Sequence, residues 1–100
     1  MTVNGKNVGF LYTVGAYCDY NDYVVANPSV SVATASLYKA EIMSREYAKV
    51  HGTDVITVEE LRALMVYELK EVLDAVTEAE KAGTKRTVET VATKKNTKTR

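Results

Sequence analysis

A capping motif, Thr57-Val58-Glu59-Glu60, opens the stretch that decides the fold, TVEELRALMVYELKEVLDAVTEAEKAG at residues 57–83. In a capping box the Thr hydroxyl accepts a backbone hydrogen bond and the Glu carboxylate reaches back to the N-cap N–H. The apolar residues that follow recur about every 3.6 positions, which is the period of an amphipathic helix. This stripe comprises Leu61, Met65, Leu69, Val72, Val76 and Ala79, widened by Leu64 and Leu73. We predict one helix here that ends at Gly83.

This predicted helix is longer than a compact domain of 100 residues requires. At 1.5 Å per residue, some 25 helical residues reach close to 40 Å. We therefore expect part of the helix to extend toward a partner.

A second helix is predicted upstream, from about Ser29 or Ser31 to His51. Its apolar stripe comprises Leu37, Ala40, Met43 and Tyr47, with charged residues on the other faces. Gly52 is expected to end the helix, because glycine readily takes the left-handed conformation of a helix C-cap. His51, the single histidine, falls in the last turn, where the helix dipole favours an imidazolium and a capping role.

The N-terminal residues predict a β-hairpin. Asn4-Gly5 is a strong signal for a two-residue turn, because both central positions of a type I′ turn need positive φ. The flanking strands would be Thr2-Val3 and Val8–Thr13. Such a small hairpin needs a helix to cover it.

Residues 13–26 are open to two interpretations, a continued strand or a helix capped by Thr13. We favour the helix, because Ala16, Tyr20, Tyr23 and Val24 then form one coherent stripe. Asn27-Pro28 would end it, because the residue before a proline is pushed out of the α region. Cys18, the single cysteine, is interpreted as a small buried hydrophobe.

The formal charge is zero but unevenly distributed. Residues 1–84 carry seven basic and twelve acidic side chains, a net −5, whereas residues 85–100 carry six and one, a net +5. Thr87–Thr93 would also suit an edge strand, and Lys94–Arg100 is expected to be disordered. The tail could follow phosphates by counterion release, but it lacks aromatic residues for base stacking, so we favour a solvated end.

Together these patterns predict an α+β fold that is mostly α, with a short N-terminal hairpin packed on about three helices, the last one long. We expect one folded domain over residues 1–84 and a flexible basic tail over residues 85–100. No apolar run approaches the roughly 20 residues of a membrane span and no secretory signal follows Met1, so we expect an intracellular protein.

The residue inventory argues against an enzyme. One histidine and one cysteine exclude most catalytic constellations, and no nucleotide-binding, zinc or metalloprotease motif is present. Asp19 and Asp22 with Glu46 or Glu41 could be imagined as a cation site, but a solvated helix face explains them better. We expect no catalytic residue, cofactor or metal.

The order of elements resembles that of the small tail assembly chaperones of long-tailed bacteriophages. The residues that carry the likeness are Asn4-Gly5-Lys6, Thr13 to Ala16, the following Cys18-Asp19, and Thr57 to Leu61, within residues 3–82. The resemblance implies a non-enzymatic protein of the infected bacterial cytoplasm. It would coat the tape measure protein and keep it soluble until tail tube subunits polymerise around it.

The physical hypothesis attached to this resemblance is capture of client helices in a groove between the first and the last helix. Seven tyrosines are unusual for 100 residues, and tyrosine suits both the rim of a small core and a binding surface. The candidate client-binding residues are Tyr17, Tyr20, Tyr23, Val24, Met43, Met65, Leu69, Val72 and Val76. The tail tube protein is a further candidate partner, and self-association is left open.

Two other function classes compete. A structural head-to-tail connector or tail completion protein would use the same helices to form a ring and would stay in the virion. A small nucleic-acid-binding regulator would use Lys85, Arg86, Lys94, Lys95, Lys98 and Arg100. The acidic body argues against nucleic acid as the partner.

Overall fold

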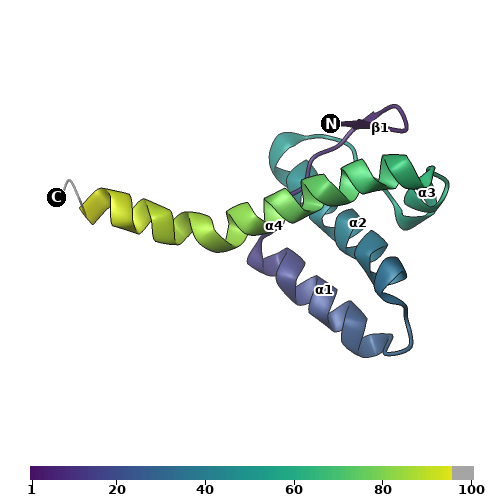
Figure 1. Cartoon of the computed structure of the whole chain (residues 1–100), viewed down its shortest axis with the longest axis horizontal. Coiled ribbons are helices and arrows are strands. Elements are labelled where there is room, and N and C mark those ends of the chain that lie inside the picture. Colours follow the sequence, from purple (N-terminus) through teal and green to yellow (C-terminus); the bar gives the residue numbers. More distant parts are fainter. Residues whose placement is uncertain (96–100) are drawn as a thin grey trace.

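A computed structural model describes the backbone of residues 1–95 and the side chains of residues 1–84. Its elements follow the order β1 (Thr2–Val3), β2 (Lys6–Asn7), α1 (Val14–Ala26), α2 (Val32–His51), α3 (Val58–Arg62) and α4 (Val66–Lys95). The chain is an α+β protein that is mostly helical, with its short sheet at the N-terminus (Figure 1). The predicted fold class is confirmed.

The N-terminal hairpin forms around the expected turn but is shorter than predicted. Asn4 and Gly5 both have positive φ, 53° and 77°, as a type I′ turn requires, and Val3 pairs with Lys6. The prediction of a strand over residues 8–13 is wrong. This segment runs extended beside α2, where Leu11 N–H donates to the Met43 carbonyl at 3.1 Å.

Local hydrogen bonds define the ends of α1 and α2 as the sequence predicts. Thr13 caps α1 by accepting from Ala16 N–H, and Ser31 caps α2 by accepting from Thr34 N–H. Gly52 ends α2 in the left-handed conformation, with φ 70°. His51 lies in the last turn of α2 and its ring stacks on Tyr47 with centroids 4.1 Å apart.

The prediction of a single helix over residues 57–83 is wrong in two respects, because the helix is interrupted and does not end at Gly83. The capping box at Thr57 forms, but it opens only the short α3, and α4 begins at Val66 after a turn. Gly83 does not end α4, whose backbone continues through residues 85–95. Residues 87–93 are therefore helical and add no edge strand, while the expected disorder of residues 96–100 lies outside the described residues.

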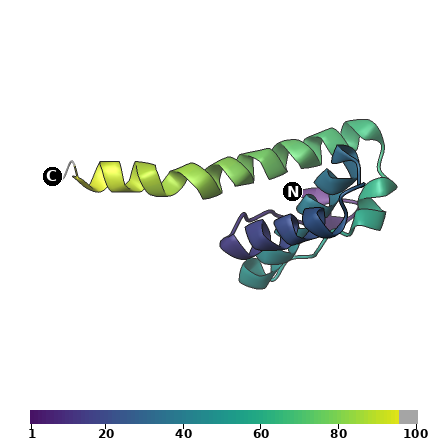
Figure 2. The same ribbon diagram turned by 90° about the horizontal axis from the view of Figure 1, so that it is seen from below.

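Helix α2 is the centre of the fold, with α1, α3 and α4 all packed against it. Helix α4 crosses α2 and its C-terminal half extends away from the other elements (Figures 1 and 2). The buried cluster comprises Val3, Val8, Phe10, Ala16, Leu37, Ala40, Ile42, Met43, Ile56, Leu61, Val72 and Val76. The hairpin thus covers one end of a core formed mainly by α2, α3 and the first half of α4.

Candidate protein-binding surfaces

Two of the predicted binding tyrosines instead attach α1 to α2. The Tyr23 ring stacks on Tyr38 of α2 with centroids 4.1 Å apart, and burial raises the pKa of Tyr23. The Tyr20 ring lies under the ammonium of Lys39, 4.4 Å from Nζ, in a cation–π contact. Tyr20 and Tyr23 are half-buried, so they hold the helix pair together.

Lys39 also connects these tyrosines to α4. Its Nζ donates to Glu80 Oε2 at 2.8 Å, in a pair whose side chains are about three-quarters buried. Tyr12 lies nearby, packed against Gly83, and burial raises the pKa of its hydroxyl. The polar and aromatic contacts at this junction orient α1 relative to α4.

The other two predicted residues of α1 are exposed. Tyr17 is 55% and Val24 37% exposed, on the side of α1 away from α2. Cys18 lies on the same side and is exposed, so the prediction of a buried thiol is wrong. The reason is that α1 is apolar on more than one face, and Ala16 takes the buried position.

Three predicted binding residues belong to the core. Met43, Val72 and Val76 are 0%, 1% and 3% exposed. They occupy the facing stripes of α2 and α4, so their apolar spacing serves the packing of these helices. Their assignment to a client-binding surface is corrected accordingly.

Met65 and Leu69 lie at a different part of the molecule from α1. Met65 is in the turn between α3 and α4, 18 residues before Gly83, which contacts Tyr12 just ahead of α1. Along α4 this separation is about 27 Å. The predicted set therefore divides between two surfaces and does not form one groove.

The turn before α4 exposes an apolar surface that we call the corner patch. Met65, Val66 and Tyr67 are 62%, 83% and 69% exposed. Leu64 and Leu69 are half-buried beside them and complete the patch. Val66 and Tyr67 are not among the binding residues predicted from sequence, although an uninterrupted apolar run in a helical segment cannot turn every side chain toward one core.

A local cap explains why the chain turns at this place. Glu68 Oε1 accepts from Met65 N–H at 2.9 Å, which satisfies one of the free donors at the start of α4. Ala63 N–H bonds to the Glu60 carbonyl and Leu64 N–H to the Leu61 carbonyl, which close the end of α3. A glutamate three residues after Met65 is the sequence signal that could have indicated the break.

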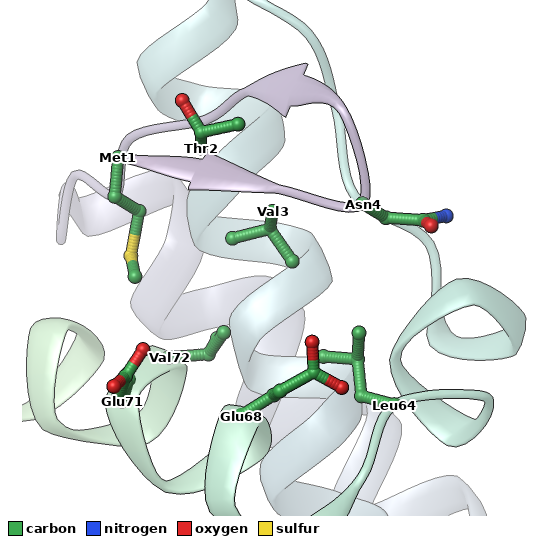
Figure 3. Close-up of a pocket in the computed structure, with 8 residues that line it drawn as sticks. All are labelled: Met1, Thr2, Val3, Asn4, Leu64, Glu68, Glu71 and Val72. Carbon is green, nitrogen blue, oxygen red and sulfur yellow. The ribbon is translucent and has the colours of Figure 1, made fainter.

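Beside the corner patch lies a notch of about 70 Å³ between the hairpin and α4 (Figure 3). Its floor includes the buried Val3 and Val72, and the carboxylates of Glu68 and Glu71 lie on its α4 side. The remaining lining residues are Met1, Thr2, Asn4 and Leu64. The notch combines an apolar floor with two acidic side chains.

An ion pair holds α3, and with it the corner patch, against the hairpin. Lys6 Nζ lies 2.8 Å from Glu60 Oε2 and donates to the Val55 carbonyl at 3.2 Å. The hydrogen bond from Lys6, followed by that from the Thr57 backbone, lowers the pKa of Glu60 to about 2. This carboxylate therefore caps α3 and ties it to β2 at the same time.

The two glutamates considered for a cation site, Glu46 and Glu41, have other partners. Glu46 accepts from Lys49 and from the Thr13 hydroxyl, and these hydrogen bonds lower its pKa. Glu41 accepts from Arg45 and from the backbone N–H of Val58. Within residues 1–84, where side chains are described, no group of three or more metal-ligating side chains occurs.

Comparisons with protein-family models, with curated proteins and with solved structures each gave no match. Among the helices of the described residues, none combines the length and the apolar character that crossing a membrane requires.

Proposed function

We propose that this chain is a non-enzymatic tail assembly chaperone of a long-tailed bacteriophage. In the cytoplasm of the infected host it would bind the tape measure protein and keep it soluble until the tail tube assembles. The observation that carries the proposal is the corner patch, because three successive large apolar side chains are exposed on a small folded body. The resemblance of the sequence to these chaperones at Asn4-Gly5-Lys6, Thr13 to Ala16 and Thr57 to Leu61 points to the same function.

The chemistry of the corner patch favours a helical, basic client segment. Met65 supplies an adaptable apolar contact and Tyr67 combines apolar area with a polar tip. The neighbouring notch adds Glu68 and Glu71, and residues 1–84 carry a net −5. An amphipathic helix with lysines or arginines beside its apolar stripe would complement both features.

A small patch can still hold a long client when many copies bind along it. Each contact would be weak, because the corner patch comprises five residues, against the roughly 20–30 residues per partner of a stable interface. Successive copies on one client raise the overall avidity without any additional contact type. The tail tube protein could then displace them one by one as it assembles.

Co-expression with a phage tape measure protein tests the proposal. We expect the chain to raise the soluble fraction of that client severalfold, and Tyr67→Asp to remove most of the effect. Val72 is unsuitable for this test, because it is 1% exposed and its substitution would disrupt the core. Val50→Asp is the matched control, since Val50 is 66% exposed at the far end of α2.

Equal client solubility with and without the chain would refute the chaperone function. Equal loss with Tyr67→Asp and Val50→Asp would refute the corner patch as the binding surface. Purified particles discriminate the nearest alternative, since a connector or completion protein would be retained in them and a chaperone would not.

A further inference from the structure

Helix α1 has a largely exposed apolar face, on which the Tyr17 ring meets Tyr12 edge-on with centroids 6.4 Å apart. Val14 and Val25 are 78% and 80% exposed, and Tyr17 and Val24 are 55% and 37% exposed. Cys18 and Asn21 are exposed between them. We call these six residues the α1 outer face, and none of them carries a charge. The inner face of the same helix packs on α2 through Ala16, through Tyr23 stacked on Tyr38 and through Tyr20 beneath Lys39.

The residues of the α1 outer face have the spacing of a helix–helix seam. Val14, Cys18, Asn21 and Val25 follow one another at steps of four, three and four, and Tyr17 and Val24 flank this line. Such a pattern is that of the a and d positions of a coiled coil. A single Asn in the middle of a seam is a known means of setting register at some cost in stability.

We propose that the α1 outer face pairs with the same face of a second copy of this chain, the two helices running antiparallel about a two-fold axis. The axis would pass between Cys18 and Asn21. Val14 then lies opposite Val25 of the second copy, and Cys18 opposite Asn21 of the second copy. Because a two-fold interface uses one patch twice, the face needs to complement only itself.

The distribution of charge on the α1 outer face favours this occupant. The α1 outer face offers no charge that would select a charged peptide, nucleic acid or lipid headgroup. The acidic residues of α1, Asp19 and Asp22, lie off the seam. In the antiparallel arrangement Asp22 approaches Gly15 of the second copy, where the neighbouring Glu46 carboxylate is already paired with Lys49 at 2.8 Å, and Tyr17 meets the Val24 side chain.

The size of the α1 outer face predicts a weak dimer. Thirteen residues form a helix about 20 Å long and about 10 Å wide, and this strip is below the roughly 800 Å² per partner of a standard interface. We expect the mass in sedimentation equilibrium to rise from 11.0 kDa toward twice that value with concentration. The change should fall between about 10 and about 1000 µM, as for other small interfaces.

A matched pair of variants of the full chain tests the surface. Val14→Glu adds a carboxylate at the first residue of α1, where the helix dipole favours it, so loss of folding is not expected. Val32→Glu makes the same change at the first residue of α2, where Val32 is 84% exposed. We expect Val14→Glu to weaken the dimer at least about tenfold, because two unpaired carboxylates would enter the seam, and Val32→Glu to leave it unchanged.

Cysteine cross-linking tests the orientation. An equimolar mixture of the unaltered chain and a larger-tagged Cys18→Ser/Asn21→Cys variant is oxidised at high concentration. Antiparallel pairing predicts mainly the mixed disulfide dimer, because Cys18 faces position 21 of the second copy. Dimers of like chains would instead indicate parallel helices and overturn the proposed orientation.

Two results would overturn the dimer itself. One is a mass that stays at 11.0 kDa at every concentration. The other is a chain that stays monomeric and that loses client solubilisation when Val14 is replaced by Glu. That outcome would assign the α1 outer face to the client. The sedimentation experiment contains no client, so its result is independent of the proposed chaperone function.

Discussion

Ser44→Ala is the most informative perturbation of the core. Ser44 is 0% exposed in the middle of α2 and its hydroxyl joins two segments. Its Oγ accepts from the buried Ile56 N–H at 3.1 Å and donates to the Glu41 carbonyl at 2.9 Å. Without the hydroxyl the Ile56 N–H has no partner in a region closed to water.

The expected magnitude follows from two opposed effects. A buried donor left unsatisfied costs about 1–3 kcal/mol, while alanine in place of serine within a helix returns about 0.5 kcal/mol. We therefore expect the free energy of unfolding to fall by about 1.5 kcal/mol, and Tm by about 6–12 °C for a domain of this size.

Urea unfolding of Ser44→Ala, compared with Ser36→Ala as a control, isolates the contribution of the buried hydrogen bond between Ile56 N–H and the Ser44 hydroxyl. Ser36 is on the same helix and its Oγ donates to the Val32 carbonyl at 3.0 Å, but it supports no second segment. Ser36→Ala should be neutral or slightly stabilising, and only Ser44→Ala should speed amide hydrogen exchange at Ile56. Equal stabilities of the two variants would refute the assignment of a structural role to the Ser44 hydroxyl.

Two further predictions concern the ion pair at α3 and the close contact at Gly83. The pKa of Glu60 lies at about 2, below the ordinary 4.5, so its pairing with Lys6 stabilises the fold above pH 4.5 and is lost as the pH falls toward 2. Glu60→Gln should flatten the fall of Tm over that interval, and an unchanged slope would contradict the assignment. A Cβ at Gly83 would lie 2.7 Å from the Tyr12 carbonyl oxygen, so Gly83→Ala should destabilise the fold by about 1–3 kcal/mol. Gly15→Ala should stabilise the fold by up to about 1 kcal/mol, because a Cβ at this position would lie 3.4 Å from its nearest atom. Urea midpoints that shift in the same direction in the two variants would contradict this account.

The features predicted correctly from sequence are those set by neighbours a few residues away. The Asn4-Gly5 turn, the Thr57 capping box and the glycine that ends α2 each depend on bonds within about four residues. The break before α4 has an equally local cause in Glu68, but the continuous apolar period across it pointed to a single helix.

The candidate site was predicted only in part, because exposure depends on contacts between distant segments. Periodicity identified the stripe that contains Val72 and Val76, but the same stripe could face either a core or a client. The structure places it against α2. Likewise, α1 is apolar on two faces, and the burial of Ala16 together with the contacts of Tyr20 and Tyr23 with α2 decides which face is buried.

The sequence by itself therefore determined the mostly helical fold class, the caps at Thr13, Gly52 and Thr57, the N-terminal turn and the division into an acidic body and a basic C-terminal segment. These properties follow from local conformational preference and from counting charges. Only the tertiary structure decided that Cys18 is exposed, that Met43 is buried and that the corner patch lies about 27 Å along α4 from the junction with α1. Burial is a relation between segments far apart in the chain, and such a relation is absent from any short window of sequence.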